Sequence, residues 1–465
     1  MLEPTAQATA ADDRDEYGRP KAELSTGRLL AVTAYWLAIT TLMGALTFSV
    51  IPRLVESVLG NSNHPLAGLA VGAVTTAGVL IAIIVQPTMG AISDGTRHRL
   101  GRRKPFIVAG TLMDLVFLAF LAWAFWNELY WPFLAAVACL QFSSNFAQGP
   151  YQGYVPDLVP SHQVGLASGL LGGANIAGNL LGPGLAILFI TVLPGVVGFP
   201  QITLGLFVTI GMIEVVTMVI TVVWVPDRPA PPNEMSLLER ATSAWGTDIL
   251  AEKDFVWVMV SRLLVLTGLV TLQAFAVFYL ENAHRMGPDE AQGASFPVLV
   301  LMLVAALISS VPGGRISNRI GRKPVLYVAI AFGALGGLML ALAPAYWVVL
   351  AAAVPIGLCT GVFLGVDWAL MTDIIPKAAS GRYMGISNIA VASAGPIGST
   401  IGGLITFAVA LFIADRTVAA EMGFRALFVV MALELGLGAL ALRRVHEPVR
   451  AGGPSAADEA RAVPA

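Results

Sequence analysis

The sequence predicts an all-α membrane protein whose twelve transmembrane helices form two similar six-helix bundles. Hydrophobic residues make up 56% of the 465 residues and charged residues only 12%, against about 25% charged in an average soluble protein. Twelve segments approach the roughly 20 apolar residues that cross a bilayer. A basic turn after the second segment recurs after the eighth, which indicates that the chain consists of two related halves.

Each predicted span is an apolar run between polar, basic or proline-containing turns. The spans are approximately 29–51, 66–91, 105–126, 131–154, 165–192, 202–225, 255–280, 295–313, 324–343, 346–370, 385–412 and 424–442. Residues 29–225 are expected to form the N-terminal bundle and residues 255–442 the C-terminal bundle, joined by a cytosolic linker at 226–254. The polar residues 1–28 and the residues 443–465 are expected to be disordered cytosolic tails.

The positions of the basic residues predict the orientation in the membrane. With both termini in the cytosol, fourteen Lys and Arg residues fall in the short cytosolic loops and four in the outer loops. Cytosolic loops carry such an excess in most membrane proteins. We therefore expect a multi-pass protein of the cell membrane with both termini cytosolic.

Several classes of function are disfavoured by the composition. The formal charge of −2 gives no reason to expect nucleic-acid binding. Cys139 and Cys359 both lie within apolar spans, so neither a disulfide framework nor a metal site is expected. The glycine cluster Gly169–Gly173 lies inside an apolar helix and does not follow a strand, unlike a nucleotide-binding loop. We expect no enzyme activity and no cofactor, and we expect a monomer in the lipid bilayer.

A second repeated motif supports the duplication. Asp-Leu-Val-Pro at 157–160 precedes Gly169 by nine residues, and Asp-Ile-Ile-Pro at 373–376 precedes Gly385 by nine residues. Two parallel repeats are typical of transporters with a binding site between the halves near the middle of the membrane. The expected mechanism is alternating access to a small-molecule substrate, with one half rocking against the other.

The basic turn carries a resemblance to a known family. Gly90-x-x-x-Asp94 followed by Gly101-Arg102-Arg103 resembles the loop signature of the major facilitator superfamily. The longer pattern is similar to the sucrose-type branch, which is grouped with glycoside–cation symporters, and it consists of Gln86-Pro87, Ser93, Arg99, Pro105-Phe106-Ile107, Asn145-x-x-Gln148-Gly149-Pro150 and Asp157-Leu158. The resemblance implies the major facilitator fold and symport of a sucrose- or maltose-like sugar or glycoside with protons.

The chain departs from that branch at two positions. Gln152 stands where the branch has an arginine, and Gln141 stands where it tends to have an aspartate. The family links those two charges to proton coupling and sugar binding, so both the coupling ion and the disaccharide substrate stay open. Residues 71–89 contain no acid, unlike the second helix of melibiose-type sodium symporters. This favours protons or facilitated diffusion over sodium coupling.

Five charged residues fall inside the spans, where charges are costly and are usually functional or paired. Asp114 lies nine residues past Pro105, roughly 13 Å into the membrane, and is a candidate proton carrier or a carboxyl satisfied by a neighbouring hydroxyl or amide. Asp367 and Arg262 lie at comparable depths and are candidates for an ion pair or a protonation switch. Glu214 and Glu434 lie on helices that the resemblance places at the outer face of each half, so a packing role is expected.

Candidate substrate-binding residues are polar or aromatic side chains on helices expected to line the cavity. They are Tyr35, Trp36, Gln141, Asn145, Gln148, Asn175, Asn179, Gln273 and Asn388. Such side chains could instead form hydrogen bonds between helices.

A cytosolic gate is expected at the two basic turns. Its residues are Asp94, Arg99, Gly101, Arg102 and Arg103 in the first half and Asn318 and Arg322 in the second. We hypothesise that Asp94 pairs with an arginine of its own turn in the outward-facing state, and that Asn318, which lacks the charge, forms a weaker latch. The alternative is that the charges only determine topology.

A glycine motif in the fifth predicted span indicates an alternative function. Gly169, Gly178 and Gly182-Pro183 have the spacing of a motif in the drug–proton antiporters of this superfamily, although Gly184-Leu185-Ala186 replaces its final glycine pair. The small residues could also serve only close helix packing and a proline bend. A proton-coupled exporter of drugs or other small hydrophobic molecules is therefore the alternative prediction.

Overall fold

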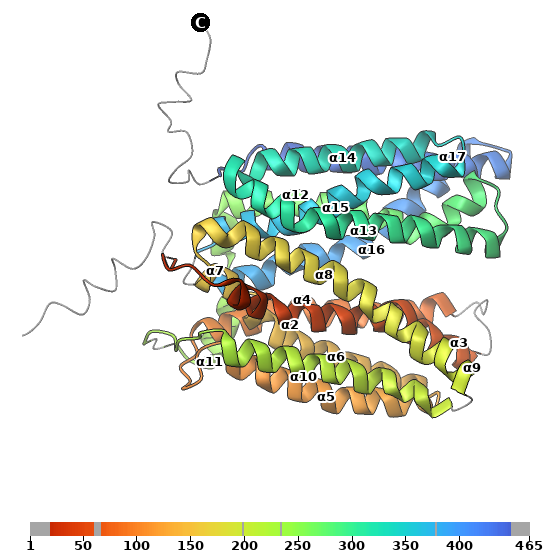
Figure 1. Ribbon diagram of the computed structural model, residues 1–465. Coiled ribbons are helices and arrows are strands. Elements are labelled where there is room, and N and C mark those ends of the chain that lie inside the picture. The colour runs from red at the N-terminus through yellow and green to blue at the C-terminus, as the bar shows by residue number, and fades with distance from the viewer. Residues whose placement is uncertain (1–18, 60–66, 198–199, 233–234, 377–378, 448–465) are drawn as a thin grey trace, which may run out of the picture.

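The computed structural model describes residues 19–59, 67–197, 200–232, 235–376 and 379–447, which form two groups of long helices (Figure 1). The N-terminal half contains α2 (Thr26–Ala45), α3 (Ile51–Leu59), α4 (Ala67–Asp94), α5 (Lys104–Trp126), α6 (Tyr130–Tyr151), α7 (Tyr154–Leu158), α8 (Val164–Ile187), α9 (Leu193–Val197) and α10 (Gly205–Trp224). The linker contains α11 (Leu237–Ser243) and a 3₁₀ turn, Thr247–Ala251. The C-terminal half contains α12 (Lys253–Ala283), α13 (Pro288–Ile320), α14 (Arg322–Leu342), α15 (Tyr346–Ile374), α16 (Ser380–Phe412) and α17 (Arg416–Leu442).

Eleven described helices are long and apolar enough to cross a membrane. The remaining predicted span, 131–154, corresponds to α6, which has 22 residues but is less apolar because it carries Gln141, Ser143, Ser144, Asn145 and Gln148. Its polar side chains face other helices, so a hydropathy threshold underrates a helix that lines the interior of a bundle.

The predicted ends were wrong for two spans. The span predicted at 295–313 is the longer helix α13, and the span predicted at 424–442 begins eight residues earlier, at Arg416 of α17. Hydropathy detects only the apolar centre, whereas both helices also include polar residues in their first turns. Pro288 occupies the first turn of α13, and Asp415 accepts hydrogen bonds from the N–H groups of Thr417 (2.8 Å) and Val418 (3.2 Å).

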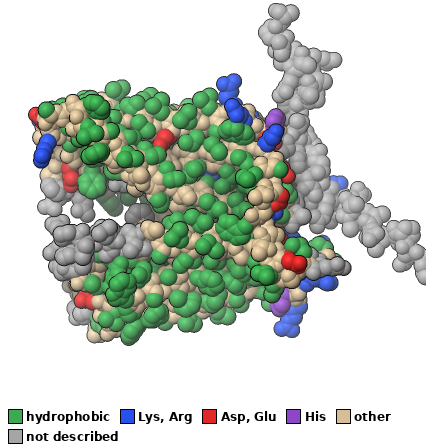
Figure 2. Space-filling view, turned by 180° about the vertical axis from the view of Figure 1, so that it is seen from behind, with side chains coloured by type: hydrophobic (Ala, Val, Ile, Leu, Met, Phe, Trp, Pro, Cys, Tyr) green, Lys and Arg blue, Asp and Glu red, His purple; other side chains and the backbone are tan. Residues whose placement is uncertain are grey.

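The two halves meet through α4 against α16 and through α8 against α13 and α15. We call the end of the bundle that carries α7 and α11 the linker side; α3 and α9 lie at the opposite side (Figure 1). On the linker side the backbones approach closely, because a Cβ on Gly90 would lie 2.2 Å from the Gly381 oxygen and one on Gly165 would lie 2.1 Å from the Gly314 oxygen. A notch separates the halves on the opposite side (Figure 2).

Gly90→Ala is expected to separate α4 from α16 on the linker side, because its methyl group has no room against Gly381. Hydrogen–deuterium exchange of the purified protein should be faster in peptides covering 86–94 and 380–388. The control is Gly173→Ala, which adds the same methyl to α8 where no atom lies within 4 Å; both changes raise helix propensity by about 1 kcal/mol. Exchange unchanged in Gly90→Ala would contradict the close contact.

Candidate functional site

A network of side-chain amides connects the two halves. The Gln86 Nε2 group on α4 donates to Gln148 Oε1 on α6 (3.0 Å) and to Asn145 Oδ1. Asn388 on α16 of the other half donates to Gln86 Oε1. Asn145, Gln148 and Asn388 are predicted site residues, whereas Gln86 was noted only as part of the family motif. The structure makes Gln86 the residue through which the halves contact each other here.

Aromatic rings form a second contact between the halves. Trp36 on α2 lies edge-on to Trp368 on α15, with ring centroids 5.2 Å apart. Trp36 also stacks on Tyr151 at 6.1 Å, and Tyr35 meets Tyr151 at 5.3 Å. The Trp368 Nε1–H is buried and has no hydrogen-bond partner among the residues described. The cluster therefore has a hydrogen-bond donor that none of the described residues uses.

The buried charges of the C-terminal half lie beside these rings. Arg262 on α12 pairs with Asp367 on α15 at 3.1 Å, and both side chains are at most 5% exposed. The Arg262 guanidinium also donates to Ser387 Oγ (3.1 Å) and lies 5.4 Å from the Trp368 ring centre. The pairing that equal depth led us to expect is therefore present, next to the contact between the halves.

The internal duplication relates the ion pair to the tyrosine pair. Tyr35 and Arg262 are the tenth residues of α2 and α12, and Tyr151 and Asp367 each precede the Asp-x-x-Pro motif of their half by six residues. Equivalent positions thus hold two tyrosines in one half and a salt bridge in the other. At the contact between the halves, the N-terminal half therefore contributes a pair of tyrosines and the C-terminal half contributes a salt bridge.

The remaining cavity candidates are less directly involved. On α8, Asn179 donates to the Asn175 carbonyl (2.9 Å) and side-chain oxygen (3.2 Å), so these two residues bond to each other. Gln141 is half-buried and accepts from Asn145 through its carbonyl at 2.5 Å and its Oε1 at 3.2 Å. The Gln273 side chain lies outside the described residues.

Three acids lie inside the bundles without an ion pair among the described residues. Asp114 is 1% exposed and accepts hydrogen bonds from Ser143 and from Ser144, the latter at 3.0 Å to both carboxylate oxygens. These are the hydroxyl contacts that the sequence allowed. Glu214 is 2% exposed on α10. Glu434 on α17 lies close to Gly268 on α12.

The first basic turn forms a compact ionic cluster on the linker side. The fully buried Arg103 guanidinium pairs with Asp94 at 3.1 Å and with Asp157 at 2.6 Å. It also donates to Ser380 Oγ of the other half at 2.8 Å. Burial alone would raise the pKa of Asp157, but the charges of Arg103 and Arg102 bring the pKa below its ordinary value. The predicted pairing of Asp94 with an arginine of its own turn is present.

Asp94 reaches beyond its own turn. Its carboxylate accepts from the backbone N–H groups of Gly381 (3.1 Å) and Arg382 (3.0 Å), at the start of α16 in the other half. A helix N-terminus has unpaired N–H groups and a positive dipole end that favour an anion. Arg102 pairs with Asp157 at 2.6 Å, whereas Arg99 is exposed.

The second basic turn repeats the arrangement with a neutral side chain. Asn318 Oδ1 accepts from the Gly165 N–H at the start of α8 (3.0 Å) and from Arg322 (2.8 Å). Asn318 Nδ2 donates to the His162 carbonyl at 2.8 Å. Arg322 pairs with Asp373 at 3.1 Å. The second half thus makes the equivalent contact with the neutral amide of Asn318, where the first half uses the charged carboxylate of Asp94.

Asp227 and Glu447 stabilise these two turns, and neither acid was predicted from the sequence. Asp227 accepts from the N–H groups of Arg103 (2.8 Å) and Lys104 (2.9 Å) at the start of α5. Glu447 does the same for α14 through Arg322 and Lys323. Each acid follows the sixth helix of its half, and that shared position is a signal a repeat comparison could have found. Gly101 is predicted to be part of the gate; its φ of +111° and the Asp227 carboxylate leave no room for a side chain.

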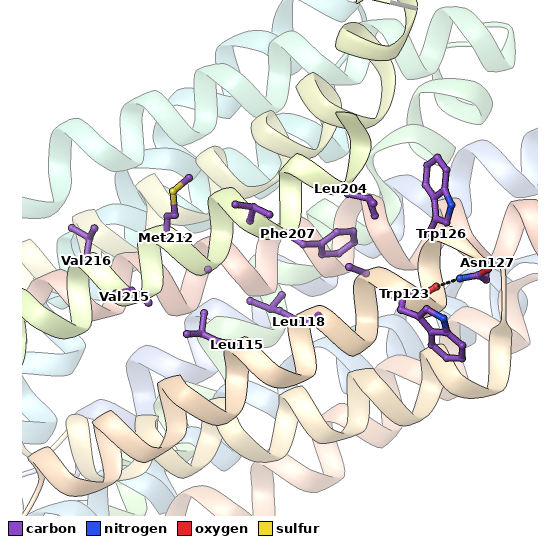
Figure 3. Close-up of a pocket in the computed structure, with 14 residues that line it drawn as sticks. Leu115, Leu118, Trp123, Trp126, Asn127, Leu204, Phe207, Met212, Val215 and Val216 are labelled. Carbon is purple, nitrogen blue, oxygen red and sulfur yellow. Dashed lines mark hydrogen bonds between the residues drawn. The ribbon is translucent and has the colours of Figure 1, made fainter. Parts of the chain in front are cut away.

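An apolar groove of about 780 Å³ between α5 and α10 is a different feature. Trp123, Trp126, Phe207 and Met212 line it (Figure 3). Trp123 and Met212 are half exposed on the outer surface. The groove faces away from the contact between the halves and offers no charged group for recognition.

Comparison with known sequences settles the family. Residues 29–399 and 283–464 match the sequence profile of the Major Facilitator Superfamily. The chain belongs to the Major Facilitator Superfamily. This membership, together with the apolar helices, makes it a multi-pass membrane transporter of small molecules and not an enzyme. The major facilitator fold predicted from the sequence is confirmed.

The similar proteins include an alpha-glucoside permease, a sucrose transport protein and a multidrug resistance protein. A general alpha-glucoside permease of Schizosaccharomyces pombe is 30% identical over 172 residues, 34% of this chain and 31% of the permease. Sucrose transport protein SUC4 of Arabidopsis thaliana is 27% identical over 38% of this chain and 37% of its own length. Multidrug resistance protein MdtG of Enterobacter lignolyticus is 23% identical over 91% and 94% of the two chains. The predicted resemblance to the sucrose branch is confirmed, over about a third of those relatives.

Solved structures of the superfamily share the fold. A bacterial homologue of the iron transporter ferroportin in an outward-facing state has a TM-score of 0.66 at 15% identity, covering 90% of this chain and 99% of that one. The proton:xylose symporter XylE has a TM-score of 0.65 at 16% identity, covering 90% and 96%. At these identities the likeness concerns the fold alone.

Proposed function

We propose that this transporter carries a sugar or glycoside together with protons. The observation that supports the proposal is the cluster between the halves, where Trp36 and Trp368 lie beside the Arg262–Asp367 pair. Aromatic faces pack against the C–H surface of a sugar, and a charged pair can donate to and accept from its hydroxyls. The Gln86 amide network adds neutral donors and acceptors.

Alternating access would use the clusters on the linker side as the inner gate. The linker side carries most of the basic loops, so the positive-inside bias makes it cytosolic, with both termini there. In the conformation described, Asp94, Arg103 and Asn318 all bond across or beside the contact between the halves. With the linker side in the cytosol, these contacts would close the inner gate, as an outward-facing state requires. The exposed apolar flanks would contact lipid around a single copy of the chain.

Proton-coupled export of hydrophobic molecules is the second candidate. It is favoured by the similarity to MdtG, which extends over 91% of the chain, whereas the sugar permeases match only about a third of it. The buried Arg262–Asp367 pair weighs against it, because a cavity for apolar compounds gains nothing from two desolvated charges.

Uptake of labelled sucrose, maltose and other glucosides into proteoliposomes, with and without an inward proton gradient, tests the proposal. We expect saturable uptake that the gradient increases. Trp368→Ala should reduce uptake at least about tenfold, a loss of about 1.4 kcal/mol of binding free energy. Trp347→Ala, at an exposed tryptophan of the same helix, should not. Gradient-driven extrusion of a dye without saturable uptake of any sugar would favour the exporter.

A further inference from the structure

We propose that Asp114 and Glu214 hold one proton between them inside the N-terminal half and form the binding site of the coupling proton. The inference deepens the proposed proton symport and depends on it. From the sequence, Asp114 is a candidate proton carrier, and a packing role is expected for Glu214. In the structure both acids are buried, on the adjoining helices α5 and α10.

Helix packing places the two acids at the same depth. Helix α5 runs away from the linker side and α10 runs back toward it, and Gly211 of α10 packs on Leu115, the neighbour of Asp114. Glu214 lies one turn beyond Gly211 toward the linker side, which brings it level with Asp114. Both acids are at most 2% exposed, and α5 and α10 pack against each other. Leu115 and Met212 border the apolar groove between these helices (Figure 3).

Among the described residues, no positive charge pairs with either acid. Within the described part of the chain, no Arg, Lys or His forms an ion pair with either acid. The titratable groups that face the pair are Tyr35 on α2, which is hydrogen-bonded to Thr111 at 2.8 Å, and Tyr151 on α6 beside it. Two buried carboxylates without a cation cannot both be ionised, so one proton must be present.

The hydrogen bonds of the two acids are unequal. Asp114 accepts from Ser143 and Ser144, whereas Glu214 is 98% buried and its Oε2 has no hydrogen-bond partner among the residues described. An unbonded carboxylate oxygen in apolar surroundings is costly, and a proton removes that cost. Asp114 is therefore held in place by the serine hydroxyl groups, whereas Glu214 lacks, among the described residues, a hydrogen bond to Oε2 that would stabilise its charge. We assign the proton to Glu214.

The pair is connected to the contact between the halves through α6. Ser144, which bonds both Asp114 oxygens at 3.0 Å, is adjacent in sequence to Asn145, a member of the amide network with Gln86. When the proton leaves Glu214, the two carboxylates repel each other, and any movement of Asp114 acts on the serines of α6 that are bonded to it. A link of this kind between proton and substrate sites is what coupled transport requires.

The first test measures the proton itself, without substrate. Infrared spectra of the purified protein at neutral pH should contain the C=O band of a protonated buried carboxyl group, and the band should be lost in Asp114→Asn with Glu214→Gln. Ser144→Ala keeps both acids and should shift the band, which tests the site even if the double variant does not fold. A band unaffected by all of these substitutions would overturn the proposal.

The second test measures coupling with labelled maltose and sucrose in proteoliposomes. Asp114→Asn and Glu214→Gln should each lower proton-driven accumulation at least tenfold while retaining exchange of labelled for unlabelled sugar. Glu434→Gln is the matched control, a buried acid of the other half, and should accumulate like the wild type. Full accumulation in both variants would overturn the pair. Absence of accumulation in the wild type would instead overturn the proposed function, whereas the infrared band still tests the shared proton.

Discussion

Asp94→Asn is expected to open the linker side and to lower transport at least about tenfold. The carboxylate accepts from the Arg103 guanidinium and from the first N–H groups of α16, at Gly381 and Arg382. Asparagine removes the charge from both interactions. A charge at a helix N-terminus contributes about 0.3–2 kcal/mol, and about 1.4 kcal/mol changes an equilibrium tenfold. Loss of the latch thus shifts the population toward the inward-open state.

Labelling by a maleimide measures this shift. Ser310 is fully buried where α13 meets α8, and its hydroxyl donates to the Gly169 carbonyl at 2.8 Å. A cysteine at this position, in a protein with Cys139 and Cys359 replaced by serine, should react faster when Asp94→Asn is added.

Asp415→Asn is the control for the charge change. Asp415 caps α17 as Asp94 caps α16, but it is exposed and lies outside the gate. Its replacement should leave both the labelling rate and transport unchanged. Equal labelling in Asp94→Asn and the wild type would contradict a gating role for Asp94.

Asp367→Ala is expected to abolish transport and to destabilise the protein. It leaves the Arg262 guanidinium buried without its carboxylate, and breaking a buried pair in this way costs about 3–5 kcal/mol. The thermal unfolding midpoint of the purified protein should fall accordingly. Glu421→Ala is the matched control, because Glu421 pairs with Arg425 in a partly exposed contact; such pairs contribute only about 0–1 kcal/mol.

A double variant separates stability from transport. Arg262→Met with Asp367→Leu removes both charges and fills similar volume, and such replacements often restore stability. We expect the unfolding midpoint to recover while sugar uptake stays absent. Recovery of uptake in the double variant would show that the pair has only a structural role.

The membrane class and the duplication could be predicted because they depend on local properties of the chain. Hydropathy sums over neighbouring residues, and the repeated basic turn is visible in the sequence. The pairing of Arg262 with Asp367 was also expected, since both residues lie at similar depth on different helices. Depth alone does not say which way a side chain points. For that reason Trp368, the partner of Trp36, was overlooked, and Glu214 was expected to serve only in packing.

The amino-acid sequence alone indicates a helical membrane protein built from two related halves, with basic turns that resemble those of the major facilitator superfamily. Which polar groups meet becomes visible only when the helices are packed together. Gln86 and Asn388 are 302 residues apart in the sequence, and their hydrogen bond depends on how α4 and α16 rotate and pack. The physical reason is that apolar length is a property of one segment, whereas a binding site is a property of the contacts between segments.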